Sequence, residues 1–150
     1  FGTQIMANWD GIRVQRYFYH RWSDDFDVLS RDFVIHRLNL SSIFENGVST
    51  SVSSILPDYI LDCQILDLFI SNKSNDDDIN YVNLEININL VKRGESVKEN
   101  KVLINKNYSQ RVVRLDNKIE NVADAVSKAL AAIADEMIID ISNSVTNYIK

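Results

Sequence analysis

The spacing of apolar residues in the last third of the chain predicts one long amphipathic helix, from Asn117 to Ile149. Apolar side chains recur there at steps of three and four residues, which places them in one stripe along a helix. The stripe consists of Ile119, Val122, Val126, Leu130, Ile133, Met137, Ile141, Val145 and Tyr148. Asn117 is suited to cap the helix, and Glu120 follows as in a capping box. Residues 129–134 are mostly alanine, so the backbone can lie close to the layer it covers.

Alternation of apolar and polar residues predicts strands in the middle of the chain. The clearest strand runs from Val82 to Leu90, and the residues between its apolar positions are Asn83, Glu85, Asn87 and Asn89. This pattern is typical of an antiparallel strand with one buried and one wet face. Residues 59–71 form another long strand, and its apolar phase slips near Ile65–Leu66, which indicates a bulge.

A third strand of this group follows a turn at residues 93–95. It runs from Val97 to Tyr108, with Val102, Ile104 and Tyr108 on one face. The polar, acidic segment 71–80, which includes Asp76 to Asp78, indicates a solvated hairpin loop before the Val82 strand.

The N-terminal part predicts a hairpin followed by a helix. Two short strands, 4–7 and 12–19, flank a turn at residues 8–11 that contains the turn-forming pair Asp-Gly. Ser23 or Asp24 then caps a helix that runs to about Ser42. One face of this helix carries Phe26, Leu29, Phe33, Val34, Arg37 and Leu40, with Leu38 on its flank. Gly47 can supply a left-handed exit, and residues 48–55 form a short, weak strand or a loop.

These elements predict an α+β fold in which an antiparallel β-sheet is covered on one face by two helices. The arrangement is a two-layer sandwich with a long C-terminal helix. We find no internal repeat and no linker long enough to divide the chain, so residues 1–150 are expected to form a single domain.

Composition excludes several classes of function. The net charge of −5 disfavours general nucleic-acid binding, which needs a basic surface. No apolar run approaches the roughly 20 residues of a membrane-spanning helix. Cys63 is the single cysteine, so the chain cannot form an internal disulfide.

Side chains suited to catalysis or metal binding are few. Asp32 and His36 are spaced to meet on a helix, but a third ligand is missing nearby, so a solvated surface pair is favoured over a metal site. Cys63 lies in a strand without an adjacent base, which favours a small apolar role over a nucleophile. Asp76 to Asp78 lack the ligand spacing of a calcium loop. We expect no catalytic residue, no cofactor and no metal, and therefore a protein that is not an enzyme.

Two features remain as candidates for contact with a partner. The first is the aromatic and basic run that contains Tyr17, Tyr19, Arg21 and Trp22. These residue types are enriched in binding hot spots, although a structural role at the end of the core is the favoured alternative. The second is the asparagine-rich wet face of the sheet, which either faces solvent or packs against a neighbouring subunit.

Several stretches, taken in order, resemble one known family. They are Gln4-Ile5-Met6 with the strand 12–17, Tyr19-His20-Arg21-Trp22-Ser23, Leu40 to Phe44 with Gly47-Val48, Asp58-Tyr59-x-Leu61, and the alanine-rich segment 125–134. Each stretch alone is weak, but their order and spacing cover nearly the whole chain. Together they are similar to the ABC-type transport auxiliary lipoproteins, which are partners of MCE-type lipid-transport systems in double-membraned bacteria.

The resemblance implies a non-enzymatic accessory subunit that docks an MCE-type protein working with a permease and an ATPase. It implies an outer-membrane lipoprotein facing the periplasm, with a signal peptide, a lipidated cysteine and a first strand upstream of Phe1. A homo-oligomer is an open expectation, and no nucleic acid is expected as a partner. The main alternative is an envelope assembly or secretion accessory of an outer-membrane pore or of the lipopolysaccharide translocon. A second alternative is a small-molecule-binding or enzymatic domain that uses His20, Asp32 and His36.

Overall fold

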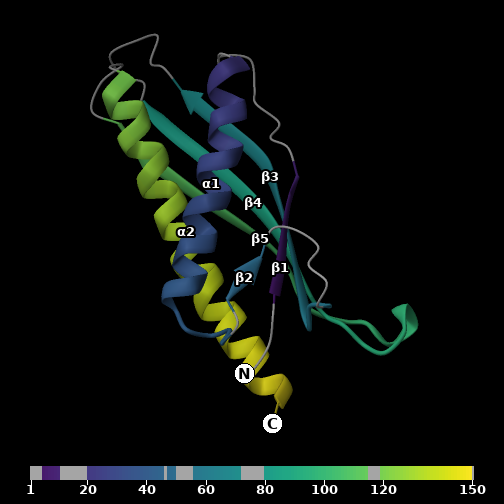
Figure 1. Ribbon diagram of the computed structural model, residues 1–150. Helices are drawn as coiled ribbons and strands as arrows, with labels where there is room; N and C mark the ends of the chain where they lie inside the picture. The colour runs from purple at the N-terminus through teal and green to yellow at the C-terminus, as the bar shows by residue number, and fades with distance from the viewer. Residues whose placement is uncertain are drawn as a thin grey trace.

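The computed structural model describes residues 5–10, 20–45, 47–49, 56–71, 80–114 and 119–149. Its elements, in chain order, are β1 (Ile5–Asp10), α1 (His20–Leu40), β2 (Val48–Ser49), β3 (Tyr59–Ser71), β4 (Tyr81–Lys92), the 3-10 turn η1 (Val97–Glu99), β5 (Lys101–Val113) and α2 (Ile119–Ile149). The strands form one sheet in the order β2-β1-β3-β4-β5. Both helices lie on the same face of this sheet, with α2 over β4 and β5 and α1 beside β1 and β2 (Figure 1). The predicted two-layer α+β fold with a long C-terminal helix is confirmed.

The predicted strands at the centre of the sheet are confirmed closely for β3 and β4. The third begins at Lys101 instead of Val97, because residues 97–99 form η1, and it extends past Tyr108 to Val113. β3, β4 and β5 pair antiparallel in succession. The apolar residues of β4 from Val82 to Leu90 are all 0% exposed, because their face of the sheet lies under the helices. The predicted bulge in β3 is present as a register shift between Ile65 and Asp67. It moves Asp67 onto the face away from the helices and returns Leu68 to the core.

The predicted stripe of α2 is the side that packs on the sheet. Its members from Val126 to Val145 are buried, and Val122 packs partly against the same core. Ala125, Ala129 and Ala134 are also buried, with 0–2% exposed, so short side chains do bring the middle of the helix close to the sheet. Asn117 and the side chains of Ile119, Glu120 and Tyr148 lie outside the described residues.

The N-terminal hairpin prediction is wrong in its turn and in its pairing. Residues 8–10 continue β1 instead of turning, and β1 pairs in parallel with β2 and β3, in register with residues 59–64. β1 is too short to determine its own partner. Pairing with β3 involves more residues than the predicted local hairpin would. The predicted second arm, residues 12–19, falls almost wholly outside the described residues.

α1 begins earlier than predicted, and its buried face overlaps the predicted one only in part, at Phe33 and Val34. It starts at His20, not at Ser23 or Asp24, because serine and aspartate favour a cap without preventing helix on their N-terminal side. Ser30, Val34 and Leu38 face the core, while Leu29 and Leu40 are 63% and 66% exposed. The helix ends at Leu40, and the left-handed residue of its exit is Ser42, with φ of 57°. Gly47, with φ of 71°, turns the chain into β2 instead.

Val102 does not share the buried face of β5 with Ile104 and Tyr108. A register shift against Leu90 and Val91 adds a residue to β5, which turns Val102 to the opposite face and leaves it 57% exposed. The tip of the β4–β5 hairpin, with η1, extends beyond the end of the sheet (Figure 1). Among the described residues, no helix is both long and apolar enough to cross a bilayer.

Candidate functional site

The structure does not place the predicted partner-binding side chains. Tyr17 and Tyr19 fall outside the described residues. Arg21 and Trp22 belong to the first turn of α1, but their side chains are likewise outside the described part. Their role therefore stays a prediction, and so does that of the acidic loop around Asp77.

The residues considered for chemistry do not assemble into a site within the described chain. The carboxylate of Asp32 accepts two hydrogen bonds from Arg31, both of 3.1 Å. Cys63 is 1% exposed on the core face of β3, as expected for a small apolar strand residue. No group of three histidine, cysteine, aspartate or glutamate side chains among the described residues could hold a metal ion.

The feature with the most polar side chains is the open face of the sheet, which we define as the side of β3, β4 and β5 turned away from the helices. It carries the β4 residues that alternate with the buried ones, together with their register partners on either side. Its polar members are Asp62, Gln64, Asp67, Asn83, Glu85, Asn87, Asn89, Asn105, Asn107, Ser109 and Arg111. The predicted wet face of β4 is therefore the centre of a wider polar surface.

Amide side chains bridge β4 and β5 at the middle of the open face. Asn87 donates from Nδ2 to Oδ1 of Asn107 at 2.6 Å and to Oδ1 of Asn105 at 3.3 Å. These cross-strand bonds fix the amide orientations and hold the two strands in register. By contrast, Oδ1 of Asn89 is buried and accepts no hydrogen bond in the structure.

Two carboxylates lie opposite each other on the open face. Asp67 of β3 pairs in register with Glu85 of β4, and the flanking pair Leu68 and Leu84 points into the core. Directly opposed residues on one face have Cβ atoms about 4.5–5.5 Å apart, so two negative charges there repel. Burial raises the pKa of Asp67, and a hydrogen bond from the Leu68 backbone only partly opposes this. Keeping the Asp67 carboxylate ionised in the folded protein therefore costs free energy.

Aromatic and apolar side chains border this polar surface. Phe69 and Tyr81 pack with ring centroids 5.9 Å apart, and the Arg111 guanidinium lies 4.1 Å from the Tyr81 centroid. Val113, the register partner of Tyr81, is 63% exposed. At the other end of β5, the exposed Val102 lies beside Val91.

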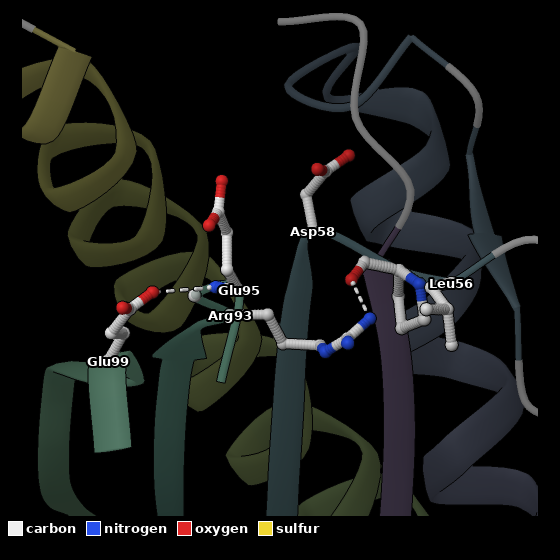
Figure 2. A pocket seen from close by; sticks show the side chains of 7 residues that line it. Leu56, Asp58, Arg93, Glu95 and Glu99 are labelled. Carbon is white, nitrogen blue, oxygen red and sulfur yellow. Dashed lines mark hydrogen bonds between the residues drawn. The ribbon is translucent and has the colours of Figure 1, made fainter. Parts of the chain in front are cut away.

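An open pocket of about 560 Å³ lies where β3 begins and β4 ends (Figure 2). It is lined by Leu56, Pro57, Asp58, Arg93, Gly94, Glu95 and Glu99. Arg93 donates to the Pro57 carbonyl at 3.0 Å, and Glu99 accepts the backbone N–H of Glu95 at 3.1 Å. These polar groups of the pocket thus bond to other parts of the protein. The bonds hold the end of the β4–β5 hairpin in place.

A second polar cluster joins β5 to α2. Asp140 accepts hydrogen bonds from Lys106 at 2.8 Å and from the Tyr108 hydroxyl at 2.6 Å. These bonds, the one from Lys106 foremost, lower the pKa of Asp140. Burial and the neighbouring Asp140 raise the pKa of Tyr108, so the phenol stays protonated and acts as a donor. The cluster is suited to holding the helix on the sheet.

No protein-family model and no curated protein matches the sequence. Solved structures do match in fold. A Xanthomonas campestris protein of the family DUF330 is 14% identical with a TM-score of 0.62, over 97% of this chain and 87% of its own. A hypothetical protein from Chlamydia trachomatis is 6% identical with a TM-score of 0.66, over 96% and 98%.

A third similar structure, from Caulobacter crescentus, is named as a candidate lipoprotein. It is 12% identical with a TM-score of 0.52, over 93% of this chain and 88% of its own. At these identities the likeness concerns the fold. The arrangement of β-sheet and two covering helices thus recurs over almost the whole length of bacterial proteins that have very different sequences.

The pairing of Asp67 with Glu85 is a feature of the open face that the sequence pattern did not reveal. The alternation in β4 placed Glu85 on the wet face, but the partner of Glu85 depends on the bulge in β3. The slip in apolar phase near Ile65 signals that bulge. Because the bulge adds one residue to β3, Asp67 and not Leu66 lies opposite Glu85.

Proposed function

We propose that this protein is a non-enzymatic accessory lipoprotein of the bacterial envelope, which docks the MCE-type protein of an ABC-type transporter that moves lipids or other hydrophobic compounds. In this role it is anchored at the outer membrane and faces the periplasm. Its contribution is contact with the partner, while the permease and the ATPase of the transporter supply the chemistry.

The observation that carries the proposal is where the family-like sequence stretches fall in the fold. Within the stretch from Tyr19 to Ser23, residues 20–23 open α1, and the stretch from Leu40 to Phe44 follows from the end of this helix. Asp58 stands directly before β3. Phe44 and Tyr59 come from separate stretches, and their rings pack in the core with centroids 5.6 Å apart. Two of the family-like stretches thus contact each other in the core of the fold.

The structural comparisons support the coarser part of the proposal. One similar structure is named as a candidate lipoprotein, and it spans nearly the same length as this chain. The similar structures from Xanthomonas campestris and Chlamydia trachomatis carry no enzyme name. These likenesses agree with an envelope-associated lipoprotein, and the MCE partner rests on the sequence resemblance alone.

The test is affinity purification of the full-length, lipidated protein from envelope extracts, with partners identified by mass spectrometry. We expect an MCE-type protein together with its permease and ATPase. A variant with Tyr17, Tyr19 and Trp22 changed to alanine should lose these partners. Lys128→Ala, on the outer side of α2, serves as the control and should retain them. Recovery of an outer-membrane pore or of the lipopolysaccharide translocon instead would contradict the transporter role and favour the assembly alternative.

A further inference from the structure

The opposed carboxylates of the open face differ from several other carboxylates in the described chain, which have cationic partners. Asp135 pairs with Arg37, Asp58 with Lys92, and Asp124 with Lys128. Asp67 and Glu85 form no ion pair with any described residue. Like charges directly opposite on one sheet face destabilise the fold. A cation from outside the described chain would remove that cost.

Among the described residues, the cationic side chain on the same face of β5 contacts another partner. Arg111 of β5 lies in register with Asn83, two residues before Glu85 on β4. Its guanidinium is placed over the Tyr81 ring, at the end of the strand away from Glu85. Among the described residues, no cationic side chain therefore neutralises the two carboxylates at the centre of the face.

The surroundings of the two carboxylates suit contact with another protein. The neighbouring Asn105 and Asn107 are exposed, and each of their amide oxygens has a second lone pair beyond the hydrogen bond that it accepts from Asn87. Tyr81 and Arg111, which belong to the residue types enriched in interface hot spots, lie at one end of the face. Exposed valines at both ends of β5, Val102 and Val113, add apolar area at the border.

We propose that the open face of β3, β4 and β5 is a docking surface for a protein segment that carries lysine or arginine side chains. The cationic groups of this segment bind between Asp67 and Glu85, and the amide oxygens of the face accept their remaining N–H groups. The negative charge of Asp67 and Glu85 determines which kind of partner fits this surface. A second copy of the chain would bring the same carboxylates, and an anionic lipid surface would be repelled. The inference does not rest on the proposed transporter role, since it concerns any partner of this chemistry.

The first experiment is an NMR titration of the isotope-labelled protein with an oligolysine peptide at low ionic strength. We expect the shifts to centre on the β3 and β4 amides around residues 67 and 85. The double variant Asp67→Asn with Glu85→Gln should bind at least about fivefold more weakly. The control double variant, Glu95→Gln with Asp124→Asn, changes the net charge equally at exposed positions and should bind within about twofold of the parent. Equal weakening by both, or shifts centred elsewhere, would overturn the proposal.

A second measurement separates a binding role from a structural one. Asp67→Asn keeps an oxygen that can accept the Leu68 N–H, and it removes the repulsion from Glu85. If Asp67 is kept for binding, this variant should unfold at a higher urea concentration than the parent protein while it binds oligolysine more weakly. A lower unfolding midpoint would show that the carboxylate stabilises the fold, and the docking role would be rejected.

Discussion

At the scale of single residues, Asp140 is a polar link between the helix layer and the sheet. It accepts from both Lys106 and Tyr108 of β5. We expect Asp140→Asn to lower the free energy of unfolding by about 1 kcal/mol, because a charge-assisted bond is lost at a partly solvated position. Urea denaturation at neutral pH measures this loss. Asp124→Asn, which breaks only an exposed pair with Lys128, should change the free energy by less than about 0.5 kcal/mol.

The pH dependence of the same variant follows from the lowered pKa of Asp140. Its folded-state pKa lies below the ordinary aspartate pKa of 3.8, so the carboxylate contributes stability above that value and loses it as the pH falls through the folded pKa. The difference in unfolding free energy between parent and Asp140→Asn should therefore be constant near neutral pH and shrink below about pH 4. A difference that stays unchanged into acid would show that the charge of Asp140 does not contribute.

Gly94 is the residue whose replacement should disturb the hairpin end most. A Cβ atom there would lie 2.4 Å from the Cβ of Glu99 and 2.7 Å from its carbonyl carbon and oxygen. We expect Gly94→Ala to cost about 1–3 kcal/mol, because backbone atoms must move apart. Thermal unfolding tests this loss. Ser96→Ala is the control, because the Ser96 side chain makes no capping bond; equal stability losses in the two variants would contradict the steric reason.

At the scale of elements, α2 depends on short side chains at its middle. Ala129 and Ala134 are 0% exposed and lie between larger core residues, so the helix backbone approaches the sheet there. We expect Ala129→Leu to lower the free energy of unfolding by about 1–3 kcal/mol through overpacking. Ser127→Leu, which adds a larger side chain on the exposed side, should have a much smaller effect in the same chemical denaturation. Comparable losses would mean that the close approach is not required.

The sequence was informative for elements whose pattern is long and repeated. α2 and β4 each carry enough alternations to define both the element and its buried face. It was less informative where two faces compete. In α1 the predicted face joined Val34 to Leu29 and Leu40. The buried stripe joins Val34 to Ser30 and Leu38 instead, and only contact with the sheet decides between these faces.

Pairing between elements was the other limit of the sequence pattern. β1 is a short strand, and its parallel partners are determined by the layer that forms around it. The candidate site shows the same limit. The polar face of β4 was predicted from its alternation, whereas the opposition of Asp67 and Glu85 depends on a register that the bulge in β3 shifts. Similarly, the exposure of Val102 depends on a bulge that its own sequence does not signal.

At the scale of the whole molecule, one core connects the N-terminal and C-terminal elements. Val34 and Leu38 of α1 belong to the same buried cluster as Ile133 and Met137 of α2, on the same side of the sheet. This continuity predicts that α1, α2 and the sheet unfold together, although the chain places β1 and α1 far from α2 in sequence. The expectation of a single domain can be tested by disturbing one end and observing the other.

Ile133→Ala makes that test, because Ile133 is 0% exposed at the middle of α2. Removing its side chain should cost about 2–5 kcal/mol. The chain has 2 tryptophans, Trp9 in β1 and Trp22 in α1, so intrinsic fluorescence reports on the N-terminal elements. Far-UV circular dichroism reports largely on α2, the longer helix, with 31 residues.

If the molecule is one cooperative unit, Ile133→Ala shifts the fluorescence and the dichroism midpoints by the same denaturant concentration. Lys128→Ala, five residues earlier in α2 on its exposed side, should leave both midpoints nearly unchanged. A fluorescence midpoint that stays at the parent value while the dichroism midpoint falls would mean that the N-terminal elements hold together without α2. The core would then be divided, and the β3–β4–β5 face would have to be regarded as the surface of a separately folding part.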